Sequence, residues 1–171
     1  MFKKCYIALL IFCFLFSFFQ SNPATLSCSN PIYPTSTTYI TSYYGYRELF
    51  VKQNFHNGID FAAPRGSPIH AILDGVVTFA GFTNGYGICV TILHTNGLKS
   101  LYGHMEENII LHHGDTVSQG QVIGYVGPKI LSNGKPNGWT TGPHLHLSLF
   151  DTEGNTFDPL TLPFEMAQKK E

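Results

Sequence analysis

The sequence predicts a mainly β fold, organised as one compact antiparallel β-sheet domain of the sandwich or barrel type. From Gly45 onward, short runs rich in β-branched and aromatic residues alternate with turns that contain Gly, Asn, Asp and Pro. No stretch of this region has a sustained helical period. With 171 residues, the chain has the length of a single domain. The predicted strands lie in the runs IHAIL, GVVTFAG, GICVTILH, LKSLYGHM, QVIGYVG and PHLHLSLF.

The N-terminal leader has the layout of a secretory signal peptide. Lys3 and Lys4 provide a positively charged start, residues 5–19 form an uncharged apolar run, and small and polar residues follow. The run is shorter than the roughly 20 apolar residues of a membrane-spanning helix. We therefore interpret it as part of a signal peptide, and a retained signal anchor is the alternative interpretation. We therefore expect export to the periplasm, the cell envelope or the extracellular space.

The charge balance argues against a nucleic-acid partner. The chain has 10 Lys and Arg residues, 11 Asp and Glu residues and a net charge of −1. Removal of Lys3 and Lys4 with the leader makes the net charge about −3. No basic run or stripe remains to neutralise phosphate groups, so nucleic acid is not an expected partner.

Two of the four cysteines, Cys28 and Cys89, lie beyond the apolar run. Outside the cytoplasm they could pair, and closing so long a loop would stabilise the fold by roughly 4 kcal/mol in the chain-entropy model. Cys28 is alternatively a lipid attachment site, although the preceding residues TLS match such a site poorly. Membrane association is thus expected only if the leader is retained or Cys28 is lipidated, and the oligomeric state stays open.

The first of three histidine clusters is HNGID, in which His56 and Asp60 stand four residues apart. That spacing would place both side chains on one face of a helix, but Asn57-Gly58 favours a turn that leads into a strand. In either case two metal-binding side chains lie close together. Taken alone, the pair could equally be an exposed loop histidine and a turn-capping aspartate.

The other two clusters are PHLHLSLF and LYGHM. In the first, His144 and His146 should point to the same face of a strand, because residues i and i+2 do so. Burying two imidazoles without partners would be costly, so this pair suits metal binding or catalysis as well as exposure to solvent. The cluster LYGHM contributes His104, and a single histidine in a strand is by itself more often structural.

Together, the three clusters have the composition of a catalytic zinc site. Two histidines and one carboxylate leave a fourth position for water, whose pKa zinc lowers to about 7. A further histidine can accept the proton of that water or stabilise the oxyanion that forms. The same donors suit iron(II), but the additional histidines and the export signal favour zinc.

The order of the motifs resembles the M23 family of zinc endopeptidases, the group that includes LytM and lysostaphin. GYR precedes HNGIDFAAPRGSPIHAILDGVVTFAG and GYGICVTILHTNG, and then LYGHM, GDTVSQGQVIGYVG and TGPHLHLSLF follow. The match runs from Gly45 to Pro159, so it is far more specific than any single motif. The resemblance implies a LytM-like, mainly antiparallel β fold with a groove over one zinc ion per chain.

The resemblance also assigns roles to individual residues. His56 and Asp60 match the family's H-x-x-x-D zinc ligands, and His146 matches the third ligand. His104 and His144 match its two other active-site histidines, which are expected to orient or deprotonate the water and to stabilise the tetrahedral intermediate. The implied function is hydrolysis of stem peptides or peptide cross-links in bacterial peptidoglycan, although the sequence does not specify which bond is cut.

This interpretation divides the chain into four parts. Residues 1–24 are the signal peptide, with an open cleavage point, and 25–44 are a lead-in rich in Ser, Thr, Tyr and Pro. Residues 45–163 are the peptidase domain and 164–171 are a C-terminal tail. The lead-in could be an ordered segment or a short linker, and it is close enough in sequence to cover the zinc site.

The loop PKILSNGKPNGWTT looks longer than the usual family connection. Its polar and aromatic side chains either line the substrate groove or form an exposed loop. These residues are Lys129, Asn133, Lys135, Asn137 and Trp139.

A second hypothesis is a non-catalytic M23-like protein that binds and regulates a cell-wall amidase. Such proteins have lost their zinc residues, whereas all five key residues are present in this chain, which favours catalysis. A D-Ala-D-Ala carboxypeptidase of another zinc class fits the motif spacing poorly.

Overall fold

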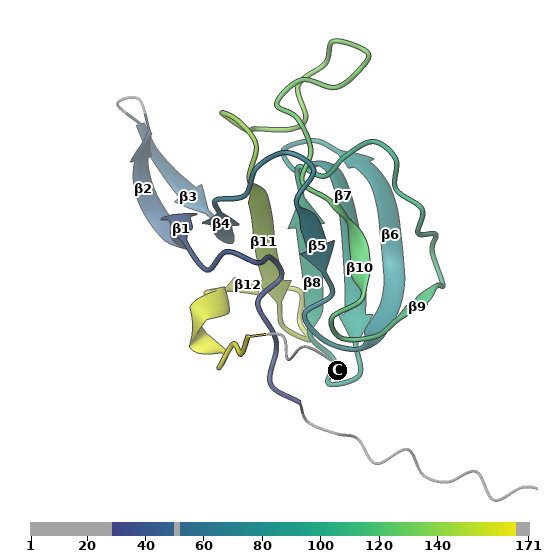
Figure 1. Ribbon diagram of the computed structural model, residues 1–171. Coiled ribbons are helices and arrows are strands. Elements are labelled where there is room, and N and C mark those ends of the chain that lie inside the picture. Colours follow the sequence, from purple (N-terminus) through teal and green to yellow (C-terminus); the bar gives the residue numbers. More distant parts are fainter. Residues whose placement is uncertain (1–28, 50–51, 167–171) are drawn as a thin grey trace, which may run out of the picture.

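The computed structural model describes residues 29–49 and 52–166, so the predicted signal peptide and Cys28 lie outside the described residues. Within them the chain forms twelve β-strands and one short 3₁₀ helix, η1 (Pro159–Thr161), and all strand pairs are antiparallel (Figure 1). The predicted mainly β, antiparallel fold is therefore confirmed. No helix in this part of the chain is long and apolar enough to span a membrane.

Six of the twelve strands overlap the six predicted runs, although IHAIL shares only Ile69 and His70 with its strand, and the other six strands lie outside these runs. The structure gives the twelve strands these bounds. They are β1 (Ile40–Ser42), β2 (Gly45–Leu49), β3 (Lys52–His56), β4 (Ile59–Phe61), β5 (Pro68–His70), β6 (Gly75–Thr83), β7 (Gly87–His94), β8 (Lys99–Gly103), β9 (Thr116–Val117), β10 (Val122–Tyr125), β11 (Leu145–Phe150) and β12 (Thr156–Phe157).

One large sheet carries most of the structure. Its strand order is β1-β4-β11-β8-β7-β6-β9, and β12 pairs with the end of β11. The short strands β5 and β10 pair with each other and lie across one face of this sheet (Figure 1). The hairpin of β2 and β3 stands beside the edge at which β4 and β1 lie. This arrangement leaves the ends of β4, β8 and β11 close to the hairpin.

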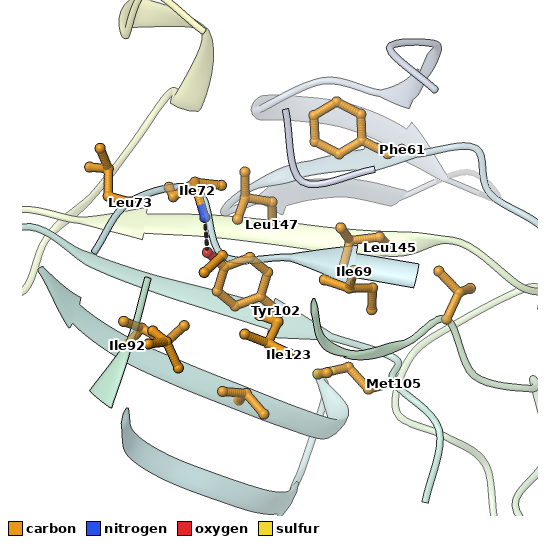
Figure 2. Close-up of a cluster of buried hydrophobic side chains, with 14 of the residues drawn as sticks. Phe61, Ile69, Ile72, Leu73, Ile92, Tyr102, Met105, Ile123, Leu145 and Leu147 are labelled. Carbon is orange, nitrogen blue, oxygen red and sulfur yellow. Dashed lines mark hydrogen bonds between the residues drawn. The ribbon is translucent and has the colours of Figure 1, made fainter. Parts of the chain in front are cut away.

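The hydrophobic core fills the space between the large sheet and the β5–β10 pair. Ile69 and Ile123 come from the two short strands, while Tyr102, Leu145 and Leu147 come from the large sheet (Figure 2). All five side chains are fully buried. Burying one such aliphatic side chain stabilises a fold by about 1.5–3 kcal/mol, so this layer holds the two sheets together.

Tyr102 brings a polar group into this core and satisfies it there. Its hydroxyl accepts a hydrogen bond from the backbone N–H of Ile72 at 2.9 Å (Figure 2). Complete burial raises the pKa of Tyr102 to about 12. The hydroxyl therefore stays neutral and links the loop after β5 to the large sheet.

The lead-in packs on the domain over its described residues. β1 pairs with β4, and Ile32 forms an isolated bridge with Glu165 near the end of the described chain. The lead-in thereby adds an edge strand to the large sheet.

Cys89 of β7 is fully buried, and burial raises the pKa of its thiol. The proposed pairing of Cys89 with Cys28 stays a prediction.

His94, at the end of β7, is buried and hydrogen-bonded through both ring nitrogens. Nδ1 donates to the carbonyl oxygen of Asp74 at 3.0 Å, and Nε2 accepts from the hydroxyl of Ser100 at 2.8 Å. Burial lowers the pKa of His94 below its ordinary value of 6.5. The folded protein therefore keeps this ring neutral at pH values where an unfolded chain would protonate it.

We predict that His94→Gln makes the stability of the protein less sensitive to acid. As the pH falls below 6.5, the unfolded chain binds a proton at His94 before the folded chain does. The free energy of unfolding therefore drops, by at most about 1.4 kcal/mol per pH unit for this one group. Denaturant unfolding at pH 7.5 and pH 5.5 should show a smaller difference for His94→Gln than for the wild type.

The matched control is His113→Gln, because His113 is exposed in a turn. This variant should keep the wild-type difference between the two pH values. A His94→Gln variant that also kept the full difference would contradict the assignment of this acid sensitivity to the buried ring.

Candidate metal centre and cleft

The candidate site is built around β11, the strand that carries His146. In the sheet register, His146 lies opposite Asp60 of β4 on one side and Gly103 of β8 on the other. His144 directly precedes β11, and His104 directly follows β8. The strand pairing thus brings all four of the predicted histidine and aspartate side chains of these strands to one end of the sheet.

The fifth predicted residue, His56, is placed by the turn between β3 and β4. The structure confirms a turn rather than a helix at Asn57-Gly58. Gly58 is needed there because a Cβ atom would overlap the carbonyl oxygen of Leu147 and lie 2.8 Å from the imidazole of His146. Only glycine lets the turn approach β11 so closely, and this approach sets His56 beside His146.

Three donor atoms converge at this point. Nε2 of His56 lies 3.1 Å and Nδ1 of His146 lies 2.9 Å from the same oxygen, Oδ1 of Asp60, and the two nitrogens are 3.0 Å apart. The ligands of a tetrahedral zinc ion at 2.0–2.1 Å would be roughly 3.3 Å from one another. All three residues are buried, with at most 8% of their surface exposed. Among the described residues, they form a group that could hold a metal ion.

The remaining ring nitrogens fix which atoms face the centre. Nδ1 of His56 lies 2.9 Å from the carbonyl oxygen of Tyr43, which can only accept, so Nε2 is left with a lone pair. Nε2 of His146 lies 2.8 Å from the hydroxyl of Ser148, which can accept its hydrogen and leave Nδ1 free. Two lone pairs and a carboxylate then point toward one another, and a bound cation would turn their mutual repulsion into attraction.

The protonation states agree with this arrangement. Burial by itself would raise the pKa of Asp60, but the adjacent imidazole groups of His146 and His56 outweigh this effect and hold that pKa well below its ordinary value. Burial lowers the pKa of His146. The group therefore offers a carboxylate oxygen and two imidazole nitrogens, a donor set that suits zinc.

Arg47 of β2 faces the other oxygen of the same carboxylate. Its Nη1 lies 3.5 Å from Oδ2 of Asp60 and donates to the hydroxyl of Ser42. Asp60 thus presents Oδ1 to the histidines and Oδ2 to the guanidinium. The lead-in supplies both Ser42 and the Tyr43 carbonyl, so it takes part in orienting the donors. Sequence reasoning noted Arg47 only as part of a motif and missed the two lead-in residues.

The two other predicted histidines lie against the same centre. Nε2 of His144 is 3.5 Å from Oδ1 of Asp60, and Nδ1 donates to the carbonyl oxygen of Gly142 at 2.9 Å. Nδ1 of His104 donates to the carbonyl oxygen of Asn137 at 2.7 Å. The centroids of the two imidazole rings are 4.8 Å apart. In both rings Nε2 is left as the nitrogen that can accept a proton.

His104 is held in an unusual environment. Its φ of 57° lies in the left-handed region, which is uncommon for residues other than glycine and recurs at functional sites. Burial and the neighbouring His144 lower the pKa of His104 to about 4. The ring is therefore a neutral base at physiological pH.

Asn137 connects the long loop to this histidine, a role that sequence reasoning missed. The residue is fully buried. Its side-chain oxygen accepts from the N–H of Ile88 at 2.8 Å, and its NH₂ group donates to the carbonyl oxygens of Met105 and Pro128 at 3.0 and 3.1 Å. The backbone carbonyl of Asn137 is thereby fixed at the position where it accepts from His104.

The site opens into a cleft of about 510 Å³. The hairpin β2–β3 forms one wall and contributes Arg47, Asn54 and Phe55. Two loop tips form the other wall, the first at residues 84–86 and the second at 138–141. Of the five loop residues considered from sequence, Trp139 lines this cleft, while Lys129, Asn133 and Lys135 are exposed elsewhere and Asn137 is buried.

Comparison with known proteins places this architecture in a family. The sequence matches the family model of peptidase family M23 over residues 54–159. It is 42% identical over 117 residues to the DD-carboxypeptidase/endopeptidase Mpg of Neisseria meningitidis, an alignment that covers 67% of this chain and 25% of the relative. It is 36% identical over 113 residues to the peptidoglycan DD-endopeptidase ShyC of Vibrio cholerae, covering 66% of this chain and 24% of the relative. The chain thus spans about a quarter of the length of these relatives.

Solved structures show the same fold. A zinc containing peptidase from Vibrio cholerae aligns with a TM-score of 0.64 and 28% identity over 80% of this chain and 41% of that one. The catalytic domain of the prophage-encoded M23 protein EnpA from Enterococcus faecalis, in a mutant form, aligns with a TM-score of 0.61 and 36% identity over 75% of this chain and 94% of that domain. From the family match and this shared LytM-like fold, we conclude that the chain belongs to peptidase family M23.

Proposed function

We propose that the protein is a zinc metalloendopeptidase that hydrolyses stem peptides or peptide cross-links of bacterial peptidoglycan. The observation that carries the proposal is the convergence of His56, Asp60 and His146 at the floor of a cleft, with His104 and His144 beside them. The relatives support the substrate class, because their names describe endopeptidases and one names peptidoglycan. A solved neighbour described as zinc containing supports the metal. This substrate implies action in the periplasm or cell envelope.

The residues of the chain divide the work between holding the metal and moving protons. His56, Asp60 and His146 would hold the zinc ion. When bound, zinc supplies a Lewis acid and lowers the pKa of water at its open position. His104 and His144 each present Nε2 as the free ring nitrogen, so one of them accepts the proton of the attacking water. The resulting Nε2–H can then donate to the oxyanion or to the leaving amine as the peptide C–N bond breaks.

The non-catalytic alternative, a regulator of a cell-wall amidase, finds no support in the site. A binding module would not need three buried metal donors with oriented lone pairs, nor two additional histidines whose second nitrogens are anchored. Maintaining such a group costs stability, because each buried polar atom must be satisfied. The intact site therefore favours catalysis.

We predict that the purified protein, supplied with zinc, releases cleaved muropeptides from peptidoglycan. His146→Ala should lower the rate by at least ~100-fold. Removing a residue that only supports a metal ligand typically lowers metal affinity or activity by about 10–100-fold, and removing the ligand itself should have a larger effect. A chelator should abolish the activity, and added zinc should restore it. His113→Ala, a histidine outside the cleft, is the matched control. Product masses measured by liquid chromatography and mass spectrometry would name the bond.

The same assay separates the alternatives. D-Ala released from uncross-linked pentapeptide stems would add a DD-carboxypeptidase activity, which the name of the Neisseria relative includes. Retained zinc without cleavage of peptidoglycan would reject this substrate, and neither zinc nor cleavage would favour the regulatory function.

A second prediction concerns Ser148, whose hydroxyl holds Nε2 of His146. Ser148→Ala should weaken Zn²⁺ binding by about 10–100-fold, because the imidazole loses the partner that fixes its tautomer. Competition with a chromophoric chelator measures this affinity directly. The control is Ser118→Ala, which changes an exposed serine just after β9 and should bind Zn²⁺ like the wild type. Equal affinities for Ser148→Ala and the wild type would show that this hydrogen bond does not orient the ligand.

A further inference from the structure

Trp139 is the single tryptophan of the chain, and it stands at the rim of the cleft with 85% of its surface exposed. An indole ring offers a large apolar face, and a soluble protein gains stability by burying it. An aromatic side chain left open beside a cleft is therefore a candidate contact for a ligand.

The backbone beneath Trp139 is fixed. Its N–H donates to the carbonyl oxygen of Gly85 at 2.7 Å, which joins the two loop tips of this wall. Gly138, with φ of +77°, lies so close to the other tip that a Cβ atom would overlap the same oxygen. Asn137 anchors the preceding position in the core. The ring is thus displayed from a rigid support, which reduces the entropy lost when it binds a ligand.

The wall around the indole is polar but uncharged. Asn84, Thr140 and Thr141 line the cleft beside Trp139. Among the described residues, the only Lys, Arg, Asp or Glu side chains that line the cleft are Arg47 and Asp60, and these face each other at 3.5 Å. A free carboxylate of a stem peptide would therefore meet neutral groups at this wall, and it would find no cation there to bind it. An N-acetylated sugar ring is itself neutral, with a C–H face for an indole and hydroxyl and acetamido groups for amide and hydroxyl partners.

We propose that Trp139, together with Asn84 and Thr141, forms a subsite for an N-acetylhexosamine ring of the glycan strand. This proposal rests on the proposed function, because the glycan is covalently joined to the stem peptide that would enter the cleft. The subsite makes the enzyme recognise peptides that are still attached to glycan. It extends recognition beyond the scissile bond to the sugar part of the same polymer.

The intrinsic fluorescence of Trp139 tests sugar binding directly, because the signal comes from one residue. Titration of the wild-type protein with tri-N-acetylchitotriose should shift or quench the emission in a saturable way. Maltotriose, which lacks acetamido groups, and a free stem tetrapeptide serve as comparison ligands. A response to the peptide but not to tri-N-acetylchitotriose would overturn the proposal in favour of a peptide subsite, and no response to either would also overturn it.

Kinetics with two substrates test the consequence for catalysis. One substrate is the cross-linked dimer with its glycan, and the other is the same dimer after an amidase has removed the sugars. Trp139→Ala should raise KM about 3- to 10-fold for the first substrate with kcat unchanged, and leave the second unaffected. The control is Tyr39→Ala, which removes an aromatic side chain that is 70% exposed outside the cleft.

The outcomes distinguish this proposal from the proposed function. Equal losses on both substrates would assign Trp139 to the peptide, and no loss on either would reject the subsite. If the wild type cleaved neither substrate, the proposed function would fail, whereas the fluorescence titration would still decide whether Trp139 binds the sugar.

Discussion

The pairing of β11 with β4 is the constraint on which the site depends, because it sets His146 opposite Asp60. These residues are 86 positions apart in the chain, yet their side chains are 2.9 Å apart. A slip of one residue in this register would turn His146 to the opposite face of the sheet. The buried leucines that alternate with the histidine in β11 resist such a slip, since they would leave the core. Packing of the sheet therefore determines the geometry of the donors.

The surroundings of the donors serve to hold them in one arrangement. Each of the three donor residues has a second contact: the carbonyl of Tyr43 for His56, the hydroxyl of Ser148 for His146, and the guanidinium of Arg47 for Asp60. The two other histidines are tied to backbone carbonyls in the same way. Outer-shell contacts of this kind fix tautomers and orientation, and they keep the site assembled before any ligand arrives.

The five residues that converge in the structure could be singled out from the sequence because their types and spacings are characteristic. The i, i+2 pair in a strand, the Asn57-Gly58 turn and the ordered family motifs identified all five side chains that the structure brings together. The alternation that predicted His144 and His146 on one face extends to Ser148, so that contact was within reach. Arg47, Ser42 and Asn137 were not, because their roles arise from contacts between distant segments. Asn137 in particular looks like an ordinary loop residue, and only the fold shows that it is buried under the cleft.

We propose that the three converging side chains bind one zinc ion. The most direct measurement is a crystal structure of the protein prepared with zinc, with diffraction data collected on both sides of the zinc absorption edge. We predict one anomalous difference peak per chain, within about 2.0–2.2 Å of Nε2 of His56, Oδ1 of Asp60 and Nδ1 of His146. A map with no peak at this position, or with zinc bound by other residues, would contradict this proposal.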